Sequence, residues 1–179
     1  NTLWTPSEIS TSLWLDASDA STITHSSNAV SQWNDKSGNN LHLAPVSGQT
    51  GPTSNSITQN SLNVLDFDGD CLENNTFTHN VTNPIYIAFV VELDADFTSQ
   101  YFLWAGTDSN TLRCGIRKRP NGYVEIFGKL SDTLGDNTFI QFGMPARGEF
   151  HILVGKIHAG SSNGAVYLNG LETQTGNSG

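Results

Sequence analysis

The sequence predicts an all-β protein, an antiparallel β-sandwich with a short helical turn near the N-terminus. Two observations favour this fold class. Apolar residues recur at every second position over several short stretches, which is the period of a strand with one covered face. Gly, Asn and Pro separate these stretches at short intervals, as in chains of many strands joined by tight turns. The 179 residues are enough for one domain with a sizeable core.

Only the N-terminus is predicted to be helical. Thr5 fits an N-cap, Pro6 the first helical position, and Glu8 the reciprocal carboxylate of a capping box. The sequence Ser-Thr-Ser follows at 10–12, so we expect a helix of only about one turn.

The strands are expected to follow one another along the rest of the chain. They are residues 62–67, 85–93, 100–104, 111–118, 123–127, 138–142, 150–157 and 165–170. The Pro120-Asn121-Gly122 turn makes 112–127 the clearest hairpin, and the last two stretches form another. Residues 85–93 (IYIAFVVEL) are apolar on both faces, which predicts a central strand. Residues 44–61 show no periodicity and are predicted to be a surface loop.

Composition limits the partners. The formal net charge of −9 would repel a phosphate backbone, which argues against nucleic acid. No apolar run approaches the roughly 18 residues of a membrane-spanning helix, so we expect no membrane insertion. Polarity comes mainly from Ser, Thr, Asn and Gly, which is common in extracellular, cell-surface and virion proteins. Cys71 and Cys114 form either one disulfide or two buried thiols, and no zinc-ligand spacing is present.

Five segments resemble a known family by their order and spacing. They are SLWLDASDAS, VSQWNDKSGNNLHL, LNVLDFDGDCLE, IYIAFVVEL and FHILVGKI with the following GAVYLNG. Together they resemble the laminin-G-like jelly-roll domains of the concanavalin A-like lectin/glucanase superfamily. In that group an Asp-x-Ser-Gly-Asn segment precedes a Phe-Asp-Gly strand, and a late strand ends in Asn-Gly, here Asn169-Gly170. The resemblance covers nearly the whole chain and implies a jelly-roll sandwich.

The resemblance also implies an incomplete domain. Domains of this group usually continue past the Asn-Gly turn with further strands, whereas this sequence ends at GLETQTGNSG. We therefore expect residues 1–179 to be a single laminin-G-like domain that lacks its last strands. Because an open sheet edge invites pairing, the candidate partners include other protein chains or a homo-oligomer that completes the edge.

Two acidic segments are candidate calcium sites. In WNDKSGNN the Asp35 carboxylate suits an Asx-type turn, with Trp33 packed beneath it. The alternative makes Asp35, with Asp16 or Asp19, oxygen ligands of a calcium ion, which is the one candidate cofactor. We favour the turn.

The second acidic segment is LDFDGDCLE. Asp66, Asp68 and Asp70 do not match an EF-hand, because Gly69 comes too early and no Glu closes the loop. Here too we favour a turn over a calcium site.

Catalysis by paired carboxylates is disfavoured. A retaining glycosidase needs two carboxylates about 5–5.5 Å apart, and enzymes of the resembled family place them as Glu-x-Asp-x-x-Glu. The nearest segment here has Glu92, Asp94 and Asp96, but Phe97 stands where the second Glu is required. We therefore expect no enzymatic activity.

Sugar binding is the remaining positive hypothesis. It needs an exposed aromatic ring for the apolar face of a sugar, with amide and carboxylate groups around it for the hydroxyls. The candidate residues form two groups: Tyr101, Trp104, Asp108 and Asn110 in the first, and Tyr123 with Arg117 and Arg119 in the second. The alternative for Trp104 is a place in the sandwich core.

Three classes of function follow from this reasoning. The first is a non-catalytic carbohydrate-binding or cell-surface recognition module, such as a lectin-like or adhesion domain of a larger surface or phage protein. The second is a structural or assembly domain, such as a virion decoration or fibre component. The third and weakest is a polysaccharide-cleaving enzyme.

Overall fold

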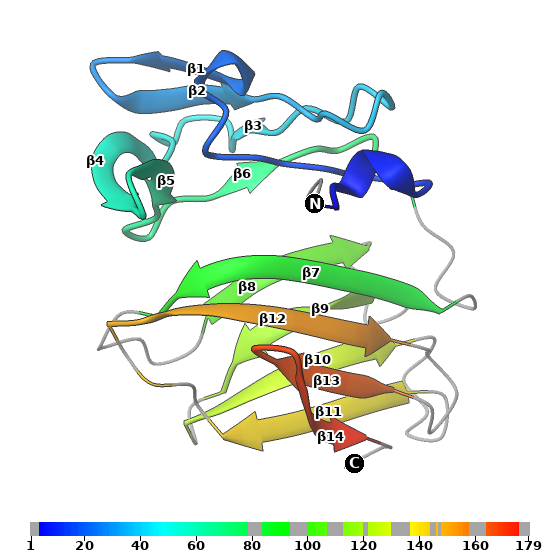
Figure 1. Ribbon diagram of the computed structural model, residues 1–179. Coiled ribbons are helices and arrows are strands. Elements are labelled where there is room, and N and C mark those ends of the chain that lie inside the picture. Colours follow the sequence, from blue (N-terminus) through cyan, green and yellow to red (C-terminus); the bar gives the residue numbers. More distant parts are fainter. Residues whose placement is uncertain are drawn as a thin grey trace. The chain divides into compact units, whose positions relative to one another are not determined.

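The structure is a computed structural model and confirms the all-β class (Figure 1). It describes residues 4–78, 84–93, 100–106, 113–119, 122–129, 137–143, 146, 148–157 and 164–175. Within these ranges the side chains of residues 100–106, 113, 129, 137, 138, 174 and 175 are not described. In the described part, no helix is long and apolar enough to span a membrane.

The chain divides into two compact units. We call them unit 1 (Asn1–Phe77) and unit 2 (Thr78–Gly179), and each is described by itself. We expected one sandwich domain over 1–179.

Unit 1 begins with the expected helical turn. The 3-10 helix η1 (Pro6–Glu8) has Pro6 at its start, and the backbone N–H of Thr5 donates to Oε1 of Glu8 at 2.8 Å. A second 3-10 helix, η2 (Ala20–Thr22), is capped by Asp19, whose side chain accepts from the Ser21 backbone N–H. Both helices are therefore fixed by side-chain oxygens at their first turns.

The strands of unit 1 form two small antiparallel sheets. The larger has the order β1-β2-β4-β5, and the smaller pairs β3 with β6. Their bounds are Ile23–Ser26 (β1), Ala29–Trp33 (β2), Ala44–Pro45 (β3), Thr53–Gln59 (β4), Leu62–Asp66 (β5) and Leu72–Glu73 (β6).

The prediction of a surface loop at 44–61 is wrong, because this range contains all of β3 and β4. The sequence of β4, TSNSITQ, has no apolar alternation, so its pattern carries no strand signal. Its pairing with β5 is also irregular between Ser54 and Thr58, and Asn55 lies in the left-handed region with φ 63°. Backbone pairing with β5 forms this strand without an apolar face.

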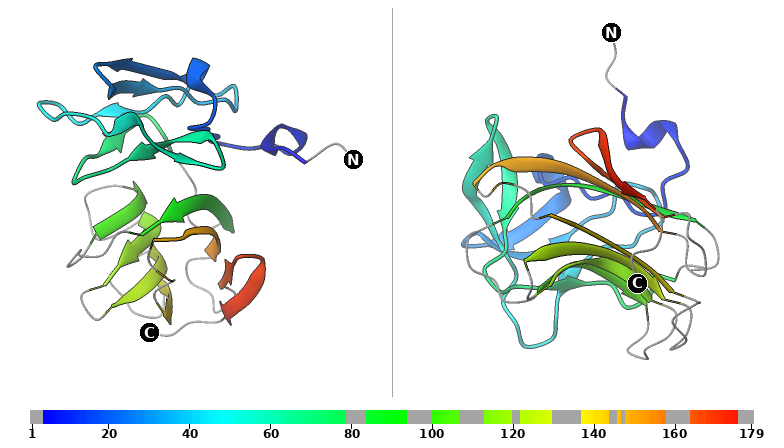
Figure 2. Two further views of the ribbon diagram at one scale, coloured as in Figure 1. Left: turned by 60° about the vertical axis from the view of Figure 1, so that its left-hand side comes forward. Right: turned by 90° about the horizontal axis from the view of Figure 1, so that it is seen from below.

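Unit 2 is sandwich-like, with two four-stranded antiparallel sheets of order β11-β10-β9-β8 and β14-β13-β12-β7 (Figure 2, right). The first sheet is built from Gln100–Gly106 (β8), Arg113–Lys118 (β9), Tyr123–Lys129 (β10) and Asn137–Gly143 (β11). The second is built from Ile85–Glu92 (β7), Phe150–Ile157 (β12), Ala165–Leu168 (β13) and Leu171–Thr175 (β14).

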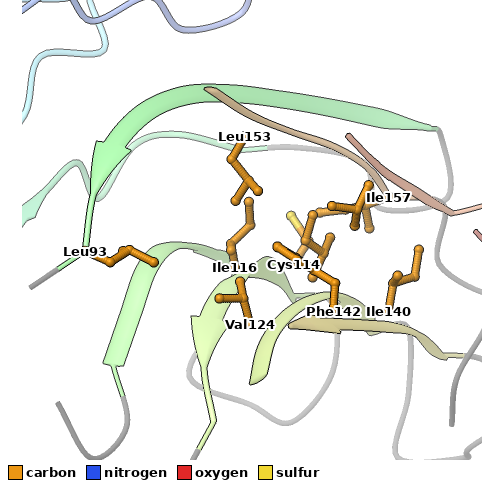
Figure 3. Close-up of a cluster of buried hydrophobic side chains, with 10 residues drawn as sticks. Leu93, Cys114, Ile116, Val124, Ile140, Phe142, Leu153 and Ile157 are labelled. Atoms are coloured by element: carbon orange, nitrogen blue, oxygen red, sulfur yellow. The ribbon is translucent and has the colours of Figure 1, made fainter. Parts of the chain in front are cut away.

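An apolar core fills the space between these two sheets (Figure 3). Its buried members are Leu93, Cys114, Ile116, Val124, Ile126, Ile140, Phe142, Leu153, Ile157 and Val166. The sheets approach closely at Gly155, where an added Cβ would lie 2.5 Å from Cδ1 of Ile126. Every second residue of β9, β10 and β11 faces this core, so the intervening residues belong to the opposite face.

The predicted hairpins are present. β9 and β10 are joined by a turn in which Gly122 has φ 83° and its N–H donates to the Arg119 carbonyl at 3.0 Å. β12 pairs with β13 as expected. Asn169 and Gly170 join β13 to β14 with φ values of 51° and 82°, as in a two-residue hairpin loop whose central residues are both left-handed.

The prediction that residues 85–93 form a central strand is wrong. β7 is the end strand of its sheet, and Tyr86 and Val90 are 69% and 64% exposed. An apolar pattern on both faces normally indicates cover on both faces. Here the residues that alternate with the core-facing side chains are exposed instead.

Candidate functional site

The face of the β8–β11 sheet that lies opposite the core brings one group of sequence candidates together. Antiparallel pairing places residues directly opposite one another across β9, β10 and β11. Arg119 lies opposite Tyr123, joined by an N–H to carbonyl bond of 2.8 Å, and Gly143 lies on the other side of Tyr123. We call Arg119, Tyr123 and Gly143 the Tyr123 row. Directly opposed side chains in a sheet are about 4.5–5.5 Å apart at Cβ, close enough for one ligand to touch both.

The next row toward the middle of the sheet is a polar network, which we call the Glu125 row. It consists of Arg117, Glu125 and Gln141. Nε of Arg117 donates to Oε1 of Glu125 at 2.7 Å, and Nε2 of Gln141 donates to Oε2 at 2.8 Å. Glu125 is only 2% exposed, and a carboxylate this deeply buried is stable as an ion only when paired and hydrogen-bonded. These partners fix its position.

The two arginines make unequal contacts with Glu125. The Arg117 guanidinium is held on two sides, by the carboxylate and by the Phe127 ring, whose centroid lies 5.0 Å from Cζ. Nε of Arg119 is 3.7 Å from Oε2, and this side chain is 38% exposed. Arg119 is therefore the arginine of the pair that is more accessible to a ligand.

Tyr123 supplies an accessible aromatic surface beside Arg119. Its side chain is 46% exposed. At Gly143, on the other side of it, an added Cβ would meet nothing within 4 Å, so the space there is open. The Tyr123 row therefore offers an aromatic ring, a cation and room for a ligand at one end of the sheet.

The first group of predicted sugar-binding residues is only partly covered by the structure. Tyr101 and Trp104 lie in β8, and the backbone register places them opposite Arg117 and Gly115. Their positions therefore adjoin the rows described above. Asp108 and Asn110 lie outside the described residues. The core position considered for Trp104 stays untested.

The hydrogen bonds of the Asp35 carboxylate form the expected Asx turn. Oδ1 of Asp35 accepts the N–H of Ser37 at 2.8 Å and of Trp14 at 3.0 Å. Oδ2 accepts the Ser37 hydroxyl at 2.7 Å and the N–H of Leu41 at 3.1 Å. Burial alone would raise the pKa of this carboxyl, but these bonds outweigh burial and its pKa lies below the ordinary value.

Asp16 and Asp19 form two turns of the same kind. In the repeated Asp-Ala-Ser sequence, each Oδ1 accepts the hydroxyl of the serine two residues later at 2.6 Å. Each Oδ2 accepts from Nζ of Lys36, at 2.9 Å for Asp16 and 2.8 Å for Asp19. Lys36 also lies 4.6 Å from the centroid of the Trp14 ring. The ammonium group thus occupies the position between the two carboxylates.

These contacts shift the acid–base equilibria of the group. Hydrogen bonds from Lys36 and Ser21 lower the pKa of Asp19 to about 2. For Asp16, burial would raise the pKa, but bonds from Ser18 and Lys36 bring it below the ordinary value. The bond to Asp19, and then that to Asp16, raises the pKa of Lys36. The predicted calcium ligands already have partners, and among the described residues no group of three or more His, Cys, Asp or Glu is arranged to hold a metal.

Among the described residues, the other acidic segments form no group that could hold a metal. Gly69 has φ 79°, and Oδ2 of Asp70 accepts the N–H of Asp68 at 3.2 Å, which is the turn that we favoured there. Glu92 ends β7 and is exposed, whereas Asp94 and Asp96 lie outside the described residues.

The two cysteines are not joined in a disulfide, and Cys71 is exposed whereas Cys114 is buried. Burial raises the pKa of Cys114 to about 11, which keeps it protonated and inert at neutral pH. Both expected alternatives are therefore wrong: the cysteines form no disulfide, and only Cys114 is buried.

Sequence reasoning missed three residues of these networks. Glu125 was detectable, because folding the hairpin about its Pro-Asn-Gly turn sets Glu125 opposite Arg117. Lys36 also left a signal, since it lies inside the third of three Asp-x-Ser sequences in unit 1. Gln141 left none, because the register of β11 is not fixed by a short turn.

Comparison with known proteins gave no match: no family model, no curated protein and no solved structure is significantly similar to this chain.

Proposed function

We propose that the protein is a non-catalytic carbohydrate-binding module that recognises a glycan at the Tyr123 row. One observation carries the proposal: an exposed aromatic ring stands between a partly exposed arginine and an open glycine position, beside a fixed Arg-Glu-Gln network. In this proposal the fold is a jelly roll of the concanavalin A-like kind, and the module belongs to an extracellular, cell-surface or virion protein.

The chemistry of the row suits a sugar. The C–H groups of a pyranose ring form an apolar face that packs on an aromatic ring, and its hydroxyls need planar donors and acceptors at fixed positions. Tyr123 supplies the ring and Arg119 a planar set of N–H donors. The side chains of the neighbouring Glu125 row are already ordered by their mutual hydrogen bonds. They therefore lose little conformational entropy when a ligand binds beside them.

The same row supports binding rather than cleavage. Glycoside hydrolysis requires a second carboxylate at a fixed distance from the first. On this face of β9, β10 and β11, Glu125 is the one carboxylate among the described residues, and it is engaged by Arg117 and Gln141.

A glycan array with the whole chain tests the proposal, in calcium and again in EDTA. We expect a specific hit that is lost in Tyr123→Ala and kept in Tyr86→Ala, the matched control in the other sheet, where the ring is 69% exposed. A Trp104→Ala variant tests the sequence-predicted group in the same experiment. Hydrogen exchange of β9 and β10 verifies that each variant is folded. A blank array with folded protein, or binding that survives Tyr123→Ala, would refute the proposed site.

The EDTA arm tests the calcium hypothesis separately. If binding needs calcium, removal of the metal abolishes the hit although the Tyr123 row is intact. We expect binding to survive EDTA, because Nζ of Lys36 already contacts one carboxylate oxygen of Asp16 and one of Asp19.

An assembly role is the second candidate function, and the free edge of β7 favours it. β7 pairs only with β12 among the described strands, its register is unbroken, and it contains neither Pro nor Gly. We take a second copy of the chain as its partner. Antiparallel pairing of two β7 strands about Phe89 would set Glu92 opposite Tyr86, so that like charges do not meet.

Sedimentation across a concentration series tests this role. Self-association should disappear in Val90→Lys, which puts a charge on the edge strand, and should persist in Lys156→Gln. A monomer at all concentrations would exclude pairing of this edge with a second copy.

A further inference from the structure

The charge of the protein is distributed unevenly along the sequence: the chain as a whole is acidic, but the segment that contains the proposed site is basic. The chain has 8 basic and 17 acidic residues. Five of the basic residues fall within 113–129, the β9–β10 hairpin, against one acidic residue, Glu125. They are Arg113, Arg117, Lys118, Arg119 and Lys129. The neighbouring strands β8 and β11 carry no charged residue. The hairpin is thus a strongly basic element in an acidic protein.

The contacts on this face show where the excess charge is accessible. Glu125 is the one carboxylate on this face among the described residues, and it makes its close contact with Arg117. Arg119 is set back at 3.7 Å and partly exposed. An arginine has five N–H donors in a planar fork, and the ion-pair contact of Arg119 with Glu125, from Nε, is at 3.7 Å longer than a hydrogen bond. The residual positive charge of the Tyr123 row is therefore concentrated on Arg119.

A carboxylate ligand fits this arrangement better than a neutral one. The planar fork of arginine binds a carboxylate through two parallel hydrogen bonds, which are stronger than bonds between neutral groups. A sugar acid carries such a group on its ring, and the ring supplies the apolar face for Tyr123. The open position at Gly143 leaves room for the adjoining sugar unit.

We infer that the ligand is an acidic glycan, bound through a ring carboxylate at Arg119 with the sugar ring stacked on Tyr123. This inference rests on the proposed function and adds the chemical class of the sugar. It also explains how a protein of net charge −9 can hold an anionic polymer: the polymer would be bound by a hairpin with five basic residues and one acidic residue, whose charge is opposite to that of the chain as a whole.

Titration calorimetry with matched ligands tests the inference. The ligands are an oligogalacturonate, its methyl ester, a sulfated oligosaccharide and polyglutamate. We expect the wild-type chain to bind the oligogalacturonate at least about tenfold more tightly than the ester, as expected for one charge-assisted contact. Affinity should fall with salt, and polyglutamate should not bind. Binding of the sulfated sugar would show whether Arg119 accepts anions other than carboxylates.

Arg119→Gln and Lys156→Gln each remove one positive charge, and comparing them locates the contact. Arg119→Gln should lose about tenfold or more in affinity for the oligogalacturonate and clearly less for the ester, which makes only neutral hydrogen bonds to this side chain. Arg119→Lys should recover part of the loss. Lys156→Gln, in the other sheet, should behave as wild type. Hydrogen exchange of the hairpin in Arg119→Gln separates loss of the contact from loss of the fold.

The outcomes separate this inference from the proposed function. If acid and ester bind equally and only Tyr123→Ala weakens binding, the site holds a glycan but the acidic class is wrong. If no sugar binds, the proposed function fails. If polyglutamate binds as tightly as the oligogalacturonate, the hairpin attracts any polyanion, and the inference of a sugar acid is overturned.

Discussion

Unit 1 and unit 2 are both built from antiparallel strands, but the side chains buried in them differ in kind. In unit 2 the buried cluster has 10 apolar members from both sheets. In unit 1 the described buried residues are few, with Ile23 and Val30 apolar beside polar Thr22, Asp35 and Ser54. Unit 1 relies instead on the three Asp-x-Ser turns and Lys36, which join segments far apart in the sequence.

This difference predicts different sensitivities. An apolar core loses stability when volume is removed from it and responds little to pH or salt. A network of carboxylates and amides loses stability when an acceptor is removed or protonated. Substitutions in each unit, followed separately, therefore test whether the two units depend on different interactions.

The largest effect is expected in the core of unit 2. Ile116 is fully buried between the sheets, and Ile116→Ala should cost about 2–5 kcal/mol because it leaves a cavity. Hydrogen exchange of β9 and β12 in denaturant measures the loss, and Ile152→Ala at a 52% exposed position is the control, with a cost of about 0.5 kcal/mol or less. If exchange in unit 1 accelerates equally, the units unfold together and the comparison fails.

The next largest effect is expected at Asp35. Asp35→Ala leaves three backbone N–H groups and the Ser37 hydroxyl without their acceptor, at a cost of about 2–3 kcal/mol. Tryptophan fluorescence during urea unfolding measures it, because Trp4, Trp14 and Trp33 lie in unit 1 and only Trp104 in unit 2. Asp68→Ala, an exposed carboxylate of the same unit, should be nearly neutral. Equal losses for both would mean that the turn contributes little.

The same contrast explains what the sequence could predict. Period-two alternation gave the strands of unit 2 from β7 to β13, because apolar packing decides their faces, but β14 was not predicted. It missed β4 in unit 1, where polar residues pair through the backbone. It also misplaced β7, since a local pattern gives the faces of a strand but not the number of its neighbours.

The candidate site was predictable only in part, for a similar reason. Tyr123, Arg117 and Arg119 were grouped correctly, because a short turn fixes the register of the hairpin. Gln141 comes from a strand that pairs with β10 at long range. The Asp35 turn was local and was identified, but the role of Lys36 depends on contacts with residues 17 and 20 positions away.

Acid should weaken unit 1 before it weakens the core of unit 2. The pKa values of Asp16, Asp19 and Asp35 are all lowered in the folded chain, so their stabilisation is complete above the ordinary value of 3.8. This stabilisation is lost as the pH falls below 3.8, and for Asp19 the loss continues until the pH passes its folded-state pKa of about 2.

At Asp35 the effect of acid should be smaller than that of Asp35→Ala, because a protonated carboxyl keeps one acceptor oxygen. Tryptophan fluorescence across this range measures it, and Asp35→Asn should show a shallower loss. An acid transition that appears first in β9 and β12 would contradict the comparison.

The smallest effect is expected at Lys36, whose ammonium group binds two partly exposed carboxylates that water and salt screen. Since the pKa of Lys36 is raised above 10.5, its contribution is present below that pH and is lost as pH rises through the folded-state value. Lys36→Gln should therefore lower the urea midpoint of unit 1 slightly at neutral pH, and remove both the salt dependence and the alkaline loss seen in the wild type. Lys156→Gln controls for the change in net charge. Should Lys36→Gln destabilise unit 1 as much as Asp35→Ala, the ammonium group would be an essential part of the network, and unit 1 would depend on its central ion pair as strongly as unit 2 depends on its core.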